Sequence, residues 1–314
     1  MILVTGGLGF IGSHTVQALL DAGEECVLVQ RRAAETLTGR FDRPVLVEQG
    51  DVNVPDTLLG IGKRHHITGI VHLAGSMPWP PSSEPPVEAA RHALGGLLNI
   101  IQAAQDWGVR RVGIASTIGV YSGIAAKDAL TEDLPLAMGS FHLIPTFKKI
   151  GELLNAHLAD ATGIDIVNYR ISGTWGPLGH SDPFFPAPEL VHAAARGRAA
   201  DLSGMSRPAY AEDALDLCYV KDTGRAIALL QTADKLRHQT YNVASGRSTS
   251  NAEIIAAIKK VVPDARIDLP TGGNASRAYL DITRLREDTG YRPEYDSERA
   301  AADYIAWLRA GHER

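Results

Sequence analysis

Residues 2–12 read Ile2-Leu3-Val4-Thr5-Gly6-Gly7-Leu8-Gly9-Phe10-Ile11-Gly12, and this stretch decides the fold of the chain. A short apolar run, typical of a buried strand, meets three glycines in the spacing G-x-x-G-x-x-G, and a helix-patterned run follows. Gly6 allows the tight turn after the strand, Gly9 lets the backbone approach a phosphate, and Gly12 lets the helix pack close to the sheet. We therefore expect the unpaired N–H groups of the helix start, near Phe10 and Ile11, to bind a dinucleotide pyrophosphate.

Strand and helix patterns alternate through the first half of the 314-residue chain. Strand-like runs lie at Ile2–Thr5, Cys26–Val29, Val45–Glu48, Gly69–Leu73, Arg111–Ser116 and Asp165–Arg170. Helix-patterned runs between most of them cover Ile11–Ala22, Pro55–His65, Pro86–Trp107 and Pro145–Ala161. This alternation predicts an α/β fold in which a doubly wound parallel sheet of the Rossmann type carries helices on both faces.

The second half of the chain is less regular. Helix-patterned runs lie at Pro188–Arg198, Asp222–Thr232, Asn251–Val261 and Glu298–Arg309, and short strand-like runs lie at Leu217–Val220 and Thr240–Val243. We expect residues 1–170 to form the dinucleotide-binding domain. We expect residues 171–314 to form mainly a smaller C-terminal substrate-binding lobe, interleaved with the last strands of the sheet.

The composition excludes several classes of protein. With 45% hydrophobic and 21% charged residues and a net charge of −5, the chain has no feature of nucleic-acid or membrane binding. No apolar run reaches the roughly 20 residues that span a bilayer, and the chain enters a strand at residue 2, so we expect no signal peptide. Cys26 and Cys218 lie in strand-like runs and are expected to be reduced thiols of a cytoplasmic protein. No Cys/His cluster has the spacing of a metal site.

The end of the second strand-like run bears on the choice of cofactor. An acidic residue usually binds the adenosine ribose there, but this chain has Val29-Gln30-Arg31-Arg32. Gln30 can hydrogen-bond a ribose hydroxyl, and Arg31 and Arg32 can pair with a 2′-phosphate, which favours NADP over NAD. Alternatively, both arginines belong to a solvated loop. Asp51, after the third strand, is placed to accept from the adenine amino group.

Further motifs follow the glycine turn in a fixed order: Gly50-Asp51-Val52, Val71-His72-Leu73-Ala74-Gly75, Ala115-Ser116-Thr117-Ile118-Gly119-Val120-Tyr121, Thr131-Glu132-Asp133, Arg170-Ile171-Ser172-Gly173-Thr174-Trp175-Gly176-Pro177, Tyr219-Val220-Lys221-Asp222, Tyr241-Asn242-Val243-Ala244-Ser245-Gly246, Asp281-Ile282-Thr283-Arg284-Leu285 and Gly290-Tyr291-Arg292-Pro293. Together with the glycine turn they resemble the extended short-chain dehydrogenase/reductase family, the NAD-dependent epimerase/dehydratase group, over nearly the whole chain. The resemblance implies cofactor contacts at Val52, Leu73, Ala74, Gly75 and Ile171.

The resemblance also implies the catalytic positions. In that family a Ser or Thr hydroxyl holds the substrate oxygen, a Tyr transfers its proton, and a Lys four residues later lowers the Tyr pKa and binds the nicotinamide ribose. Thr117, with Ser116 beside it, matches the first position, and Lys148 matches the lysine. The tyrosine position holds Ile144, and the chain contains no Tyr-x-x-x-Lys. Isoleucine cannot transfer a proton, so one alternative is that His142, Tyr121 or a water molecule serves as the proton donor. A second is that the reaction needs no proton transfer at this place. A third is that the protein binds the cofactor without ordinary turnover and Lys148 only anchors it.

The substrate side departs from nucleotide-sugar enzymes, which commonly bind the diphosphate through an arginine before the Val-x-Asp segment. Here that stretch, Glu212–Cys218, is acidic and apolar, and only Arg207 and Arg277 remain as candidates. Apolar groups are plentiful after the sheet strands, and they suit a smaller, partly apolar or aromatic substrate; they are Met77, Trp79, Phe141, Ile144, Trp175, Phe184 and Phe185. We expect substrate contacts from Met77, Thr117, Tyr121, Ile144, Trp175, Arg207 and Arg277.

The sequence thus predicts an NAD(P)-dependent enzyme that acts on a hydroxyl or carbonyl of a small molecule, with a non-standard proton donor and no metal. The reaction is either net redox or a transient oxidation within an epimerase or dehydratase cycle. A lyase or aldol-type enzyme on the same scaffold and a non-catalytic NAD(P) sensor remain alternatives, since a fold alone does not choose among them. We expect a homodimer formed through the helices near Gly95–Trp107 and Thr146–Ala161.

Overall fold

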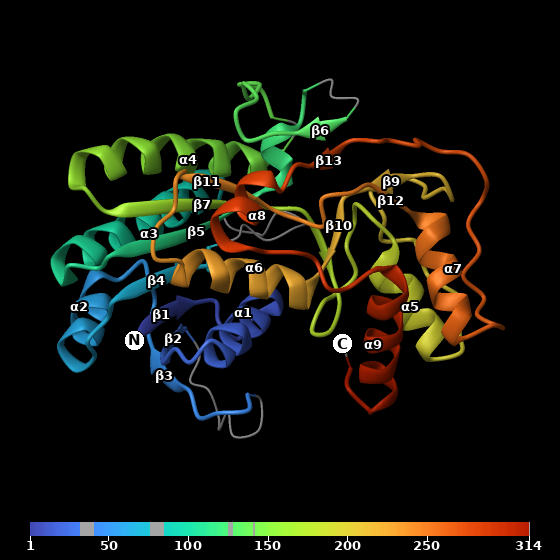
Figure 1. Cartoon of the computed structure of the whole chain (residues 1–314), viewed down its shortest axis with the longest axis horizontal. Helices are drawn as coiled ribbons and strands as arrows, with labels where there is room; N and C mark the ends of the chain where they lie inside the picture. Colours follow the sequence, from blue (N-terminus) through green and yellow to red (C-terminus); the bar gives the residue numbers. More distant parts are fainter. Residues whose placement is uncertain (32–40, 76–84, 125–127, 141, 314) are drawn as a thin grey trace.

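The large parallel sheet organises the molecule (Figure 1). The computed structural model describes residues 1–31, 41–75, 85–124, 128–140 and 142–313. Seven strands lie in the order β11-β7-β5-β4-β1-β2-β3, and every neighbouring pair is parallel. They are β1 (Ile2–Thr5), β2 (Cys26–Gln30), β3 (Leu46–Gln49), β4 (Gly69–His72), β5 (Arg111–Thr117), β7 (Asp165–Ile171) and β11 (Thr240–Val243). The chain order reverses between β1 and β4, which is where such sheets bind ligands, and the predicted Rossmann-type fold is confirmed.

Helices cover both faces of this sheet because the strands are apolar on both faces. Ile2 and Val4 of β1 pack into a core with α1 (Phe10–Asp21) and α6 (Val220–Thr232). Leu3 points the opposite way, as strand alternation requires, into a second core. Three helices contribute to that second core, namely α2 (Pro55–Arg64), α3 (Pro86–Trp107) and α4 (Leu143–Thr162). Figure 1 shows these three helices on the face of the sheet opposite α1 and α6.

A further core lies beside the sheet and is built from the C-terminal part of the chain. The strands β8 (Gly173–Trp175) and β10 (Leu217–Tyr219) pair with each other and pack against α5 (Ala187–Ala195), α7 (Asn251–Val261) and α9 (Ser297–Arg309). The predicted strand at Leu217–Val220 therefore exists, but it pairs with β8 and not with the large sheet. The strand at Thr240–Val243 does join the large sheet, beside β7.

Short elements complete the fold. The strands β9 (Ala214–Leu215) and β12 (Thr249–Ser250) form an antiparallel pair, and β6 (Ala129–Leu130) and β13 (Tyr279–Leu280) form a parallel one. A 3₁₀ turn, η1 (Ile118–Tyr121), follows β5, and α8 (Thr283–Thr289) precedes α9. The sequence patterns did not predict these pieces because two to seven residues are too few to show a hydrophobic period.

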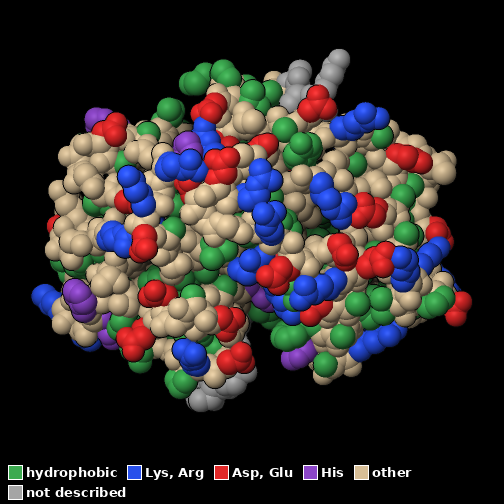
Figure 2. Space-filling view, in the orientation of Figure 1, with side chains coloured by type: hydrophobic (Ala, Val, Ile, Leu, Met, Phe, Trp, Pro, Cys, Tyr) green, Lys and Arg blue, Asp and Glu red, His purple; other side chains and the backbone are tan. Residues whose placement is uncertain are grey.

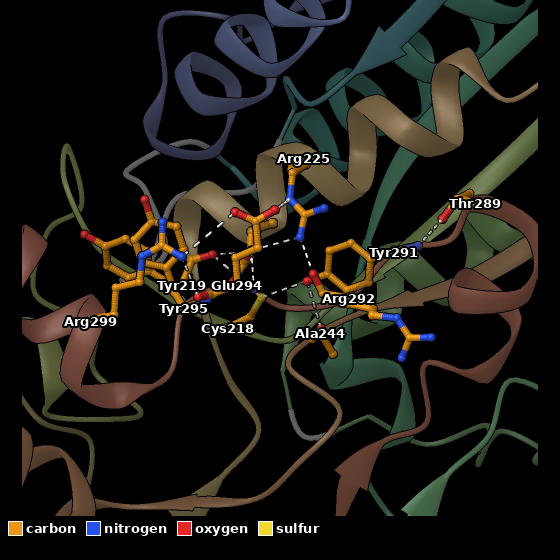
Figure 3. A network of polar contacts seen from close by, with 12 residues as sticks. Cys218, Tyr219, Arg225, Ala244, Thr289, Tyr291, Arg292, Glu294, Tyr295 and Arg299 are labelled. Atoms are coloured by element: carbon orange, nitrogen blue, oxygen red, sulfur yellow. Dashed lines mark hydrogen bonds and ion pairs between the residues drawn. The ribbon is translucent and has the colours of Figure 1, made fainter.

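A polar network fixes the C-terminal segment against α6 (Figure 3). Arg225 of α6 reaches toward Glu294, with Nε 3.4 Å from Oε1, and also donates to the carbonyl of Arg292. Its guanidinium lies 5.1 Å from the ring centre of Tyr291, whose hydroxyl donates to Ala244 O at 3.3 Å. This network joins helix α6 and the end of β11 to the segment that leads into α9.

The surface carries positive and negative side chains interspersed on the face shown in Figure 2. Among the described residues, no helix is both long and apolar enough to cross a membrane, and no group of three potential metal ligands occurs.

Candidate active site

A cleft of about 1440 Å³ opens at the carboxyl ends of the sheet strands, between the sheet and the C-terminal part of the chain. It brings together the glycine turn, the ends of β2, β4, β5 and β7, and the start of α4. Arg32 lies outside the described residues, but all the other predicted cofactor contacts line this cleft: Gly6, Gly9, Phe10, Ile11, Gly12, Gln30, Arg31, Asp51, Val52, Leu73, Ala74, Gly75, Lys148 and Ile171.

The glycine turn has the compactness that the sequence suggested. Gly6 has φ +71°, and a Cβ there would lie 3.0 Å from the backbone N of Ala74. A Cβ on Gly12 would lie 2.0 Å from the carbonyl oxygen of Gly6, so only glycine fits. Helix α1 begins after Gly9 with no side-chain cap and no acidic residue in its first turn. Its first N–H groups are left for an anion, as a pyrophosphate site requires.

The far end of the cleft presents groups suited to an adenosine. Gln30 ends β2, and its buried Nε2 has no hydrogen-bond partner among the described residues. A buried amide without a partner is costly, so this donor points to a bound acceptor such as a ribose hydroxyl. Arg31 is exposed at the cleft edge. Asp51 Oδ1 accepts from the backbone N of Asn53 at 2.9 Å, which fixes the carboxylate in the cleft wall.

Thr117 and Lys148, the two residues that match the catalytic positions of the family, both line the cleft. Thr117 is the last residue of β5, and its Oγ1 accepts from the N–H of Gly119 at 3.2 Å, which leaves its O–H to donate. Lys148 Nζ donates to the carbonyl of Ala115 at 2.6 Å, and burial lowers the pKa of this ammonium to about 8. Ile144 lies one helical turn before Lys148 and lines the same cleft. The position expected for a proton donor is therefore apolar.

Ser116 and Tyr121 also line the cleft, but their hydroxyls belong to a buried network. Ser116 Oγ donates to Glu152, whose carboxylate also pairs with Arg170 (Nη2–Oε2 2.7 Å). The Tyr121 hydroxyl donates to Asn242 Oδ1 at 2.8 Å and accepts from Arg170 at 2.9 Å. Burial raises the pKa of Tyr121 to about 12. Both hydroxyls thus brace the site, and Tyr121 is a poor proton donor at neutral pH.

His142 caps helix α4 at the mouth of the cleft. Its Nδ1 accepts from the N–H of Ile144 at 3.2 Å, and its ring stacks on Phe184 at a centroid distance of 5.6 Å. An accepting Nδ1 assigns the proton of the neutral ring to Nε2. Burial lowers the pKa of His142 below its usual value, so the ring is neutral at pH 7.

A cavity of about 50 Å³ with a mixed polar and apolar lining adjoins the cleft behind Lys148 and Ile144. His72 and Asn155 also line it, and Asn155 Oδ1 is buried without a partner among the described residues. His72 Nδ1 lies 2.8 Å from Thr5 Oγ1, and burial lowers the pKa of this ring to about 3, so it is neutral. The cavity is large enough for a few water molecules, and Lys148, His72 and Asn155 supply polar groups that bind them.

Three predicted substrate contacts lie away from the cleft, and Met77 falls outside the described residues. Trp175 is 2% exposed and packs in the C-terminal core, because the preceding residue of β8, Thr174, faces the cleft and neighbouring side chains alternate. Arg207 pairs with Asp213 at 3.4 Å in a separate pocket. Arg277 is exposed and does not line the cleft.

The structure adds cleft residues that the sequence did not single out. Ser172 and Thr174 follow β7, and Asp182 and Leu215 come from the C-terminal part of the chain. Ser172 and Thr174 could have been expected, since they directly follow a predicted sheet strand. Leu215 had no such signal because its strand has only two residues.

Comparison with known proteins identifies the family. The model of the NAD dependent epimerase/dehydratase family matches residues 2–244. The chain belongs to this family. Its membership confirms the predicted relationship to the extended short-chain dehydrogenase/reductases and the prediction of an epimerase/dehydratase-type enzyme.

Relatives with known names cover nearly the whole chain. It is 27% identical to a UDP-glucose 4-epimerase of Lacticaseibacillus casei, over 94% of this chain and 92% of that protein. It is also 27% identical to a dTDP-glucose 4,6-dehydratase of an Actinoplanes strain, over 98% of both. Among solved structures, the UDP-glucose 4-epimerase of Thermotoga maritima with UDP-glucose gives a TM-score of 0.81 at 22% identity, covering 99% of both chains. The Bifidobacterium longum enzyme with NAD+ and UDP gives 0.80 at 21%, covering 98% of both chains.

Proposed function

We propose that this protein binds NAD(P) in the cleft and acts on a hydroxyl or carbonyl carbon of a small molecule, by net redox or within an epimerase or dehydratase cycle. One observation carries the proposal: a single cleft holds the glycine turn, Thr117 and Lys148, in a chain of this family. In this assignment residues 1–170 mainly serve the dinucleotide, and residues 171–314 mainly serve the substrate.

The residues present fit a dinucleotide. The first N–H groups of α1 receive the pyrophosphate, the unpartnered Nε2 of Gln30 donates to a ribose hydroxyl, and Asp51 accepts from the adenine amino group. Arg31 at the cleft edge can pair with a 2′-phosphate, which supports a preference for NADP. Lys148 then holds the nicotinamide ribose. When bound, the nicotinamide supplies hydride transfer.

Thr117 and Lys148 have distinct tasks toward the substrate. The O–H of Thr117 donates to the substrate oxygen, while the Oγ1 atom accepts the Gly119 N–H. In the reducing direction the oxygen also needs a proton, which Ile144 cannot give. We infer that Lys148 gives this proton and regains it from a water molecule in the adjoining cavity, held between the ammonium and Asn155 Oδ1.

His142 is the second candidate for the proton carrier. With Nδ1 accepting from the helix, its neutral ring can donate a hydrogen bond through Nε2, but it cannot accept a proton there. It therefore fits polarisation of a carbonyl better than proton removal from an alcohol. The pH dependence of turnover separates the two: Lys148 predicts an inflection near pH 8, and a His142 variant would leave that inflection in place.

The first test is native mass spectrometry of the purified protein with titration of NAD(H) and NADP(H). A retained nucleotide supports a cofactor recycled within one turnover, and weak binding with NADP(H) preferred supports a net oxidoreductase. No nucleotide binding refutes the proposal. The Lys148→Met variant should lose about 10²–10⁴-fold in turnover.

The apolar Ile144 also favours a second function. Loss of the usual proton donor suits a lyase or aldol-type reaction on the same scaffold, which would show turnover with no change in cofactor absorbance. Tight cofactor binding without any turnover, insensitive to Lys148→Met beyond cofactor affinity, would instead indicate a sensor.

We also propose a homodimer formed through α3 and α4 of a protein located in the cytoplasm. These helices pack side by side on one face of the sheet (Figure 1), and their outer surfaces expose apolar side chains. Leu98 of α3 is 45% exposed, and Ile150 and Leu153 of α4 are 37% and 66% exposed. Neighbouring exposed apolar groups of this kind mark protein interfaces.

A further inference from the structure

The side of the cleft formed after β7 differs chemically from the cofactor side. We call it the C-terminal wall, and it consists of Ser172, Gly173, Thr174, His180, Asp182, Phe184, Phe185 and Leu215. This wall contains no lysine or arginine among the residues described. Its carboxylate, Asp182, accepts the N–H of Phe184 at 2.7 Å, and burial raises the pKa of this group. A diphosphate needs charge-assisted donors, and this wall offers it a carboxylate instead.

Backbone donors do not make up for the missing cations. Helix α5 begins beside the wall, and a helix start can bind phosphate through its free N–H groups. Here its N-cap is Pro186 and its second residue is Pro188, and neither has an N–H. Glu189 also lies in this first turn, where its carboxylate pairs with Arg198 (Nη1–Oε1 2.6 Å). This helix start is therefore a poor site for an anion.

The cleft also ends at the C-terminal wall. Phe184, Phe185 and Leu215 separate it from a pocket of only about 30 Å³, which has room for about two water molecules. The arginine of that pocket, Arg207, is already paired with Asp213.

The wall offers apolar and aromatic surface where it lacks charge. Phe184 is 38% exposed although it is a large apolar side chain, and its ring lies parallel to His142 within 6°. Leu215 and Ile144 add apolar surface to the cleft that also contains the Thr117 hydroxyl. Such a surface gains from covering by another ring, because aromatic faces stack favourably.

We propose that the substrate is an uncharged molecule in which the reacting hydroxyl or carbonyl is attached to an aromatic ring body, and that it carries no nucleoside diphosphate. This inference rests on the proposed function. It sets the chain apart from the relatives whose names contain UDP-glucose or dTDP-glucose.

The test uses the full chain saturated with the dinucleotide that it binds, and it compares two kinds of probe by calorimetry. The aromatic probes are benzaldehyde, acetophenone and cinnamaldehyde, and the nucleotide probes are UDP and UDP-glucose. We expect at least one aromatic probe to bind and neither nucleotide probe to bind at millimolar concentration. Phe184→Ala should weaken aromatic binding about 3- to 10-fold.

Leu215→Arg adds the missing cation at a partly exposed position of the wall. We expect it to improve UDP binding by about 10-fold or more. Leu59→Arg, on the exposed surface of α2, is the matched control and should not change UDP binding. Binding of UDP or UDP-glucose to the native protein, or binding of no aromatic probe, overturns the substrate class. Failure to bind any dinucleotide overturns the proposed function instead, so the two failures are distinguishable.

Discussion

We expect the buried ammonium of Lys148 to lower the free energy of unfolding, although the proposed function requires this residue. Burial of its ammonium lowers the pKa from 10.5 to about 8, so below pH 8 the folded state carries a charge that it solvates poorly. The full difference corresponds to about 3 kcal/mol. Because the Lys148 side chain also contacts the open cleft, solvent reduces this penalty. We therefore expect Lys148→Met to raise the free energy of unfolding by about 1–3 kcal/mol at pH 7. The loss of the hydrogen bond to Ala115 O offsets part of this gain.

The pH dependence isolates this effect. Between about pH 8 and 10.5 the unfolded lysine holds a proton that the folded one has lost, so the contribution of Lys148 to stability rises with pH across this window. Urea unfolding of nucleotide-free protein and Lys148→Met from pH 7 to 10 measures the difference, in which other titrating groups cancel. The stability advantage of the variant should shrink as the pH rises. A constant difference, equal to that of a variant of the exposed Lys63, would refute the reasoning.

Three further outcomes are expected. Ile144→Tyr should raise carbonyl reduction by adding a second proton donor beside Lys148, by less than the factor of about 10²–10⁴ that a sole general acid contributes, whereas Ile144→Phe should not; equal rates in steady-state assays would count against this. Glu152→Gln should lower the free energy of unfolding by about 3–5 kcal/mol, because it leaves the buried Arg170 without its counter-charge; a loss under about 1 kcal/mol in urea titrations would contradict it. Leu153→Asp should shift the protein from dimer to monomer in analytical ultracentrifugation, and an unchanged mass would exclude α4 from the interface.

The large sheet was predictable from sequence because long, apolar strands and amphipathic helices carry strong periodic signals. Of the sheet strands, β1 and β11 match their predicted bounds, and the other strands differ from theirs by one residue at one end or both. Among the helices, α3 and α7 match as well. The short strands β9 and β12 could not be predicted from the sequence, because each is defined by pairing with a partner far along the chain and not by a pattern in its own residues.

The residues on the cofactor side of the cleft could also be predicted from the sequence. Its residues follow strands of a parallel sheet directly, and the carboxyl ends of such strands converge. The substrate side depends instead on how irregular segments pack. The sequence Ser172-Gly173-Thr174-Trp175 does not show which of its side chains face the cleft, because this depends on the orientation of β8. The sequence therefore predicted a substrate contact from Trp175, whereas in the structure Trp175 lies in the C-terminal core and Thr174 lines the cleft.

Strand β11 has a consequence for how the chain folds during synthesis. The edge of β7 is covered only when Thr240–Val243 arrive, and α6, which covers one face of the sheet, is made in the same interval. At ribosomal rates of about 5–20 residues per second, the stretch from Ile171 to Val243 takes about 4–14 s. Until then the nascent six-stranded sheet presents an open edge at β7 and an uncovered apolar face, the features that promote aggregation. Because β11 comes from the second half of the chain, the edge of β7 stays unpaired until residues 171–243 have been synthesised.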